Sequence, residues 1–211
     1  MKQKVEGYLV FTSLGYRLAV DILIPLALVG FHVFFSGEEG GSGPIIMLLL
    51  PLLEIVCDNW FLGGIQEKNA ENMDYLKTSS KGMKVIRSVL ILDYARRFMT
   101  AVTVFGICFL MNRFLFHADS QIGADLILPV LMSYSLSVLG TLITRFQSYL
   151  WINMLVGYVA TIISIVFYII VMYGRIRVIV INAVFMILAV VFSILAVKIA
   201  MTRVEGGFYD K

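Results

Sequence analysis

Six long apolar segments follow one another along the chain, and they constrain the fold more than any other feature. They run roughly over residues 17–35, 44–65, 98–116, 125–144, 149–172 and 178–200. Each is long enough for a helix across a hydrocarbon core about 30 Å thick, which needs about 20 residues. Strands of a membrane barrel would be about 10 residues long with strict alternation, and that pattern is absent. The sequence predicts an all-α polytopic membrane protein with six transmembrane helices in a single transmembrane domain, residues 1–211.

Composition excludes the main soluble classes. Of the 211 residues, 60% are hydrophobic and 15% charged, whereas a soluble domain has about 45–50% and about 25%. Cys57 and Cys108, the two cysteines, both fall inside apolar segments, so a disulfide-built scaffold is excluded as well. Little sequence remains for a soluble domain.

The distribution of basic residues predicts the orientation. With six spans, fourteen of the 17 lysines and arginines fall on the side that also holds both termini. Because cytoplasmic loops are enriched in these residues, we expect a multi-pass protein of the cell membrane with both termini in the cytoplasm. Residues 1–16 carry apolar side chains among polar ones, which indicates a helix lying in the cytoplasmic interface of the membrane.

Residues 66–97 form the longest polar stretch and hold eleven of the 31 charged residues. They predict a short helix over residues 69–77 and, after "TSSKG", a second helix from Met83 that leads into the third span. Ile86, Val89 and Leu90 share one face of that second helix, which suits the membrane interface. Asp93 is spaced to pair with Arg96 or Arg97. Two interpretations remain open: a solvated connector that attracts anionic lipid, and a docking element for a cytosolic partner.

Ionisable residues inside a span indicate functional sites. Asp21 follows Arg17 by four residues, which predicts an ion pair within the first span. Glu54 and Asp58 are four apart on one face of the second span, with Glu54 near mid-membrane. They are either carboxyl groups satisfied by a neighbouring helix or a site for a cation or proton on a transport pathway.

Small and weakly polar residues form stripes on the fourth and fifth spans. This pattern is typical of close helix packing, within the chain or against a second copy, and less often of contact with substrate. On the fourth span Ser133 and Ser137 are also candidates for a polar pathway lining. The residues of the two stripes are Ser133, Ser137, Gly140, Thr141 and Thr144, and Asn153, Gly157, Ala160 and Ser164.

The motifs of the common membrane enzymes are missing. The chain has no G-x-x-x-x-G-K-[ST] phosphate loop and no H-E-x-x-H pair. We therefore expect no catalytic residue, no metal site and no cofactor bound by this chain, and nothing in the sequence predicts a nucleic-acid partner.

Six spans with cytoplasmic ends, an interfacial N-terminal helix and a charged helical loop after the second span resemble the ABC-2 permease family. The layout is most similar to small permeases of Gram-positive bacteria that export peptides such as bacteriocins or phenol-soluble modulins. The resemblance implies a dimer with a second permease copy or a paralogue, and a separate ATPase subunit that binds ATP and Mg²⁺. The loop matches at "KNAENMDYLKTSSKGMK", which implies ATPase-coupling residues Asn72, Met73, Asp74, Tyr75, Leu76 and Lys77.

One departure concerns the connection between the fifth and sixth spans. Many family members have short re-entrant helices there, whereas this chain has about five residues. This argues against a large extracellular gate and a polysaccharide substrate, and leaves amphipathic peptides or lipid-like compounds.

The leading hypothesis is therefore the permease subunit of an ATP-driven exporter. One alternative is an autonomous ion-coupled transporter that uses Glu54 and Asp58. Another is a non-transporting membrane protein, such as an immunity or scaffold factor.

Overall fold

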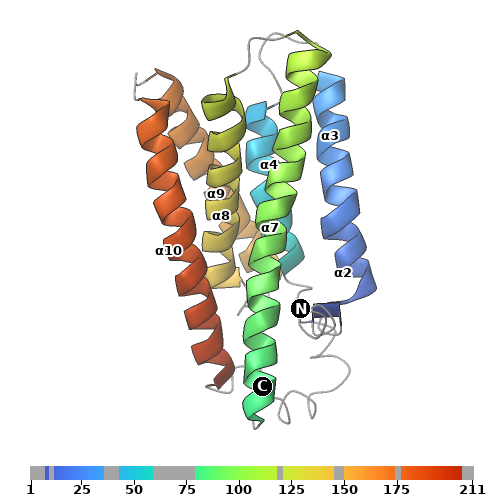
Figure 1. Cartoon of the computed structure of the whole chain (residues 1–211), viewed down its shortest axis with the longest axis vertical. Coiled ribbons are helices and arrows are strands. Elements are labelled where there is room, and N and C mark those ends of the chain that lie inside the picture. Colours follow the sequence, from blue (N-terminus) through green and yellow to red (C-terminus); the bar gives the residue numbers. More distant parts are fainter. Residues whose placement is uncertain are drawn as a thin grey trace.

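The computed structural model describes residues 8–9, 12–35, 43–58, 79–117, 121–144, 150–173 and 177–205 as an elongated bundle of roughly parallel helices (Figure 1). These ranges contain no strand, so the predicted all-α fold is confirmed. In chain order the helices are α2 (Leu14–Leu18), the π-helix η1 (Ala19–Leu23), α3 (Ile24–Phe35), α4 (Gly43–Cys57), α7 (Ser80–Phe114), the π-helix η3 (Ile122–Ile127), α8 (Leu128–Thr144), α9 (Leu150–Tyr173) and α10 (Val178–Glu205).

Four helical stretches are long and apolar enough to cross a membrane. They are Leu14–Phe35, Lys81–Phe114, Ile122–Leu142 and Val178–Glu205, which overlap the first, third, fourth and sixth predicted spans. The fifth predicted span is helix α9, and the second contains α4, whose 15 residues extend about 22 Å. A membrane protein is thus supported, while the crossing of all six helices stays a prediction.

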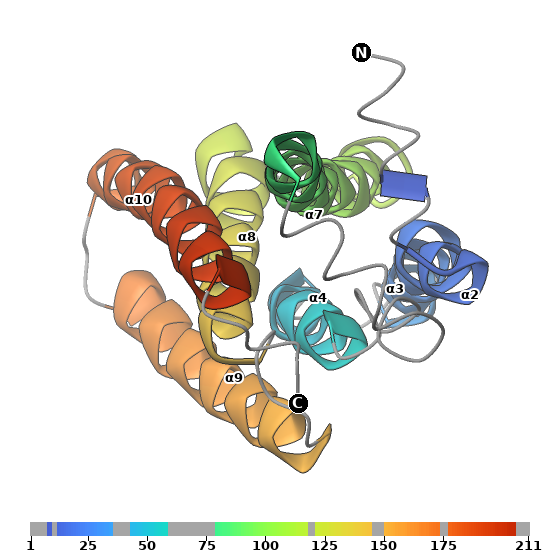
Figure 2. The ribbon, with the colours of Figure 1, turned by 90° about the horizontal axis from the view of Figure 1, so that it is seen from below.

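Helix α8 occupies the centre of the bundle. It packs against α4, α7, α9 and α10 (Figure 2). Seven consecutive residues, 132–138, are buried, so every side of this part of the helix is covered. This explains why residues 132–138 include no charged residue: a charge at any of these positions would be buried.

Helix α7 runs without a break for 35 residues, about 52 Å, so the predicted second loop helix and the third span are one element. Ser79 caps its N-terminus by accepting a hydrogen bond from the Gly82 amide at 3.3 Å. The half after Arg97 is apolar, and the half before it is rich in charge. The prediction of an interfacial face was wrong: Ile86, Val89 and Leu90 are each only 1% exposed and belong to the protein core.

Two prolines follow the two π-helices. Pro25 and Pro129 are the second residues of α3 and α8, directly after η1 and η3. Proline has no amide hydrogen and its ring clashes with the carbonyl four residues earlier, so the preceding turn widens. Asp21 lies in the widened turn η1, which presents it toward α7.

Glycines let α8 and α9 approach α4 closely. A side chain at Gly140 would collide with Ile55 of α4, and one at Gly157 would collide with Leu52. Ala160 is also buried. The small residues at these positions thus face a helix of the same chain.

Candidate functional site

Charged side chains from four parts of the chain meet in one group inside the bundle, which we call the ion-pair cluster. Helix α7 supplies two arginines and an aspartate. Helix α4 supplies a glutamate, and the residue directly after α4 is an aspartate. The α2–η1 segment adds a tyrosine and an aspartate, and α8 adds a serine. The members are Tyr16, Asp21, Glu54, Asp58, Asp93, Arg96, Arg97 and Ser137.

Arg97 is the centre of the ion-pair cluster and is only 1% exposed. Its Nη2 donates to Asp58 Oδ1 at 2.5 Å, and its Nε donates to Asp93 Oδ2 at 3.1 Å. Its Nη1 donates to Ser137 Oγ at 2.9 Å. Ser137 in turn donates to Glu54 Oε2 at 2.6 Å. One guanidinium therefore ties together α4, α7 and α8 through charge-assisted hydrogen bonds.

Arg96 connects the same group to the first span. Its Nη2 donates to Asp93 Oδ1 at 3.2 Å and to the Tyr16 hydroxyl at 3.3 Å. The Arg96 guanidinium also lies 5.7 Å from the centre of the Tyr16 ring, a cation–π distance. Its Nη1 lies 3.5 Å from Glu54 Oε1 and 3.8 Å from Asp21 Oδ1.

Acidic groups outnumber basic ones in the ion-pair cluster, with four carboxyl groups and two guanidinium groups. Glu54 Oε1 has no hydrogen-bond partner in the described part of the chain. Nearby, burial and the Asp93 carboxylate raise the pKa of the Tyr8 phenol above its ordinary value. In the described ranges no three His, Cys, Asp or Glu side chains are placed to hold a metal ion. The ion-pair cluster joins helices through salt bridges and charge-assisted hydrogen bonds.

The ion-pair cluster lies where α7 changes from its charged half to its apolar half. Arg97 is at the midpoint of this helix, about 25 Å of helix from either end. The ion-pair cluster is therefore midway along the longest of the four membrane-length stretches.

The structure brings some of the predicted site residues together. Glu54, Asp58 and Ser137 all belong to the ion-pair cluster. Ser133 lies one turn before Ser137 on α8 and is buried, and its hydroxyl has no hydrogen-bond partner among the described residues.

Other predicted residues are placed elsewhere or are not described. Gly157 and Ala160 lie on α9 away from the ion-pair cluster. The side chains of Asn153 and Ser164 are outside the described part. The coupling residues Asn72, Met73, Asp74, Tyr75, Leu76 and Lys77 also lie outside the described residues.

Sequence reasoning missed the cationic partners of the carboxylates. It placed Arg96 and Arg97 just outside the third span and paired Asp21 with Arg17. In the structure Asp21 pairs with Arg96 of another helix. A signal was present: Glu54 and Asp58 lie four apart on one face of the second predicted span, and two arginines directly precede the third.

Comparisons of the chain with models of protein families, with curated proteins and with solved structures found no match.

Proposed function

We propose that this chain is the membrane-spanning permease subunit of an ATP-driven exporter, coupled to a separate cytosolic ATPase through residues 72–77. One observation carries the proposal. Asp58 directly precedes the segment 59–78, and its carboxylate binds Arg97 of the helix that follows that segment. The two helices that flank the coupling segment are thus joined by a buried ion pair, so a force on the segment reaches α4 and α7 together.

The shape of α7 supports the same function. A continuous helix of 35 residues moves as a rigid lever, and its charged half begins directly after the coupling segment. Movement of that half displaces Arg96 and Arg97, which contact the first, second and fourth predicted spans. The ion-pair cluster then transmits movement from the coupling segment to the membrane helices.

The substrate class and the partners follow from the resemblance. The exported compound is an amphipathic peptide or a lipid-like molecule, and the permease works as a dimer with a second copy or a paralogue in the cell membrane. ATP and Mg²⁺ bind to the ATPase subunit, because this chain has no phosphate loop.

The pairing of the carboxylates argues against the ion-coupled alternative. Glu54 and Asp58 face Arg96 and Arg97, which already neutralise much of their charge. The observation that favours this alternative is that Glu54 Oε1 is buried and accepts no hydrogen bond within the described residues. A scaffold or immunity protein would not need ion pairs that transmit movement between spans.

The test uses the permease–ATPase complex purified from membranes. We expect the triple variant D74A/Y75A/L76A to lose most of the bound ATPase, with unchanged thermal unfolding of the helices. The matched control is R113A/R177A, which removes two exposed charges outside the stretch that resembles the coupling loop. ATPase binding by the triple variant equal to that of the control contradicts the assignment of the coupling residues.

A further inference from the structure

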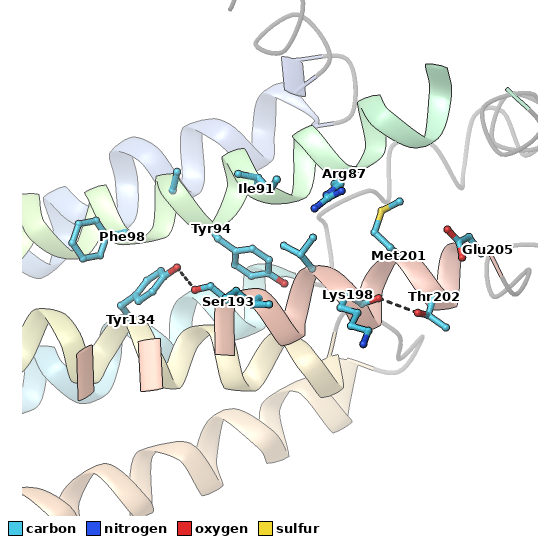
Figure 3. Close-up of a pocket in the computed structure, with 13 residues that line it drawn as sticks. Arg87, Ile91, Tyr94, Phe98, Tyr134, Ser193, Lys198, Met201, Thr202 and Glu205 are labelled. Atoms are coloured by element: carbon cyan, nitrogen blue, oxygen red, sulfur yellow. Dashed lines mark hydrogen bonds between the residues drawn. The ribbon is translucent and has the colours of Figure 1, made fainter. Parts of the chain in front are cut away.

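A groove lies between α7 and α10, with Tyr134 of α8 between them (Figure 3). Helix α10 lies on the side of α7 away from α2 (Figure 2). The volume of the groove is about 850 Å³, within the range of pockets that hold small organic ligands. It is separate from the ion-pair cluster, because none of the cluster members lines it.

One end of the groove is apolar, and the two hydroxyl groups described there are hydrogen-bonded. The Phe98 and Tyr134 rings meet edge to face, with centroids 5.4 Å apart. The Tyr134 hydroxyl is hydrogen-bonded to Ser193 Oγ at 2.7 Å, and Ser193 donates to the Ala189 carbonyl at 2.6 Å (Figure 3). Since these polar atoms are paired with one another, this end offers a ligand only apolar contact.

The other end of the groove is charged. Arg87 of α7 and Lys198 of α10 are exposed, and neither makes an ion pair within the described ranges. Glu205 lies farther along α10 (Figure 3). Two cations against one carboxylate leave an excess positive charge, which complements an anionic group.

The length of the groove matches one membrane leaflet. Between Arg87 and Phe98 the groove face of α7 is lined by Ile91, Tyr94 and Ala95. This stretch is about 16 Å of helix, against about 15 Å for half of a hydrocarbon core. A molecule that fits has an apolar chain of leaflet length and an anionic head.

We propose that this groove binds an anionic phospholipid, with one acyl chain along Ile91 toward Phe98 and the phosphate at the end of the groove that Arg87 and Lys198 line. Binding requires neither the ATPase nor transport, so this site stands whether or not the exporter function does. A second copy of the chain suits the groove less well, because a twofold contact would bring the same cations from both copies together.

The test measures lipid binding to the purified full chain by native mass spectrometry. Phosphatidylglycerol is compared with phosphatidylcholine of the same acyl chains. We expect phosphatidylglycerol to bind more tightly, and R87Q/K198Q to lower its affinity by an order of magnitude or more, given the contribution of each basic residue near an anionic headgroup. The matched control K81Q/K84Q removes the same charge from exposed positions of α7 outside the groove and is expected to keep the preference.

A second measurement locates the chain. Phosphatidylglycerol with a photoreactive group at the end of its acyl chain should label Phe98, Tyr134 or Ser193. A bulky side chain in A95W should reduce that labelling without changing the charge of the protein. Equal binding of the two lipids, an equal loss in the control variant, labelling elsewhere, or dimers cross-linked through the groove would each overturn the proposal.

Discussion

Removing the Arg97 guanidinium is the sharpest perturbation of the fold. In R97M a shorter, unbranched apolar side chain replaces the charged one. Asp58 and Asp93 then lose their hydrogen bonds to Arg97 at 2.5 and 3.1 Å, and Ser137 loses its bond at 2.9 Å. All these groups are buried, with exposures of 2% or less. Leaving a buried ion pair without one partner costs about 3–5 kcal/mol, so we expect a loss of about 4 kcal/mol in the free energy of unfolding.

The matched control is R113M, which removes an exposed arginine near the C-terminal end of α7. A surface substitution of this kind changes stability by about 0.5 kcal/mol or less. The assay is reversible unfolding of the purified protein in mixed micelles, followed by the helical circular dichroism signal. Asp58→Asn and the double variant complete a cycle, in which we expect a coupling energy of at least about 1 kcal/mol. An R97M variant within about 1 kcal/mol of the wild type would refute the central role of Arg97.

Two further predictions concern packing and charge. Gly140→Ala should destabilise the protein by about 1–3 kcal/mol, because the new methyl group meets Ile55. In Gly106→Ala no described atom lies within 4 Å of the added methyl group, so this control should be neutral or stabilising by up to about 1 kcal/mol in the same unfolding assay. Equal effects of the two substitutions would contradict the close approach of α8 to α4. Glu54→Gln should retain ATP-driven export in reconstituted vesicles, because the amide can still accept the hydrogen bond from Ser137. Loss of export in E54Q, together with transport driven by a proton or sodium gradient, would instead support the ion-coupled alternative.

Apolar segment length was sufficient to predict the helical class. Burial in a membrane depends on the summed hydrophobicity of a segment, and that sum can be read from one sequence. The four membrane-length stretches each overlap a predicted span for this reason. The start of α7 was predicted three residues too late. The sequence predicts a helix from Met83 after "TSSKG", whereas α7 begins at Ser80 inside that stretch, because the Ser79 side chain caps its first turn.

The ion-pair cluster could be predicted only in part. The spacing of Asp93, Arg96 and Arg97 predicts pairing along one helix, and both pairs are present. Contacts between helices depend on which faces meet, and hydrophobic periodicity is weak in a helix that is apolar on most sides. The partners of Glu54 and Asp58 were missed for that reason. In addition, a span predicted from hydropathy stops at the first arginine, even when that arginine is buried beside an acidic side chain.

The amphipathic face at Ile86 shows the same limit. An apolar face on a charged helix suits a membrane surface and a protein core equally, because both remove it from water. In the structure the core covers it. A single sequence does not distinguish the two environments.

The most direct test of the proposed function is affinity purification of the chain from its native membranes, with the bound proteins identified by mass spectrometry. If the chain is the permease of an exporter, we expect a cytosolic ATPase in stoichiometric amount that carries the phosphate loop missing from this chain. We also expect the purified complex to hydrolyse ATP. A chain that purifies without an ATPase and transports in liposomes under an ion gradient alone would contradict the proposed function.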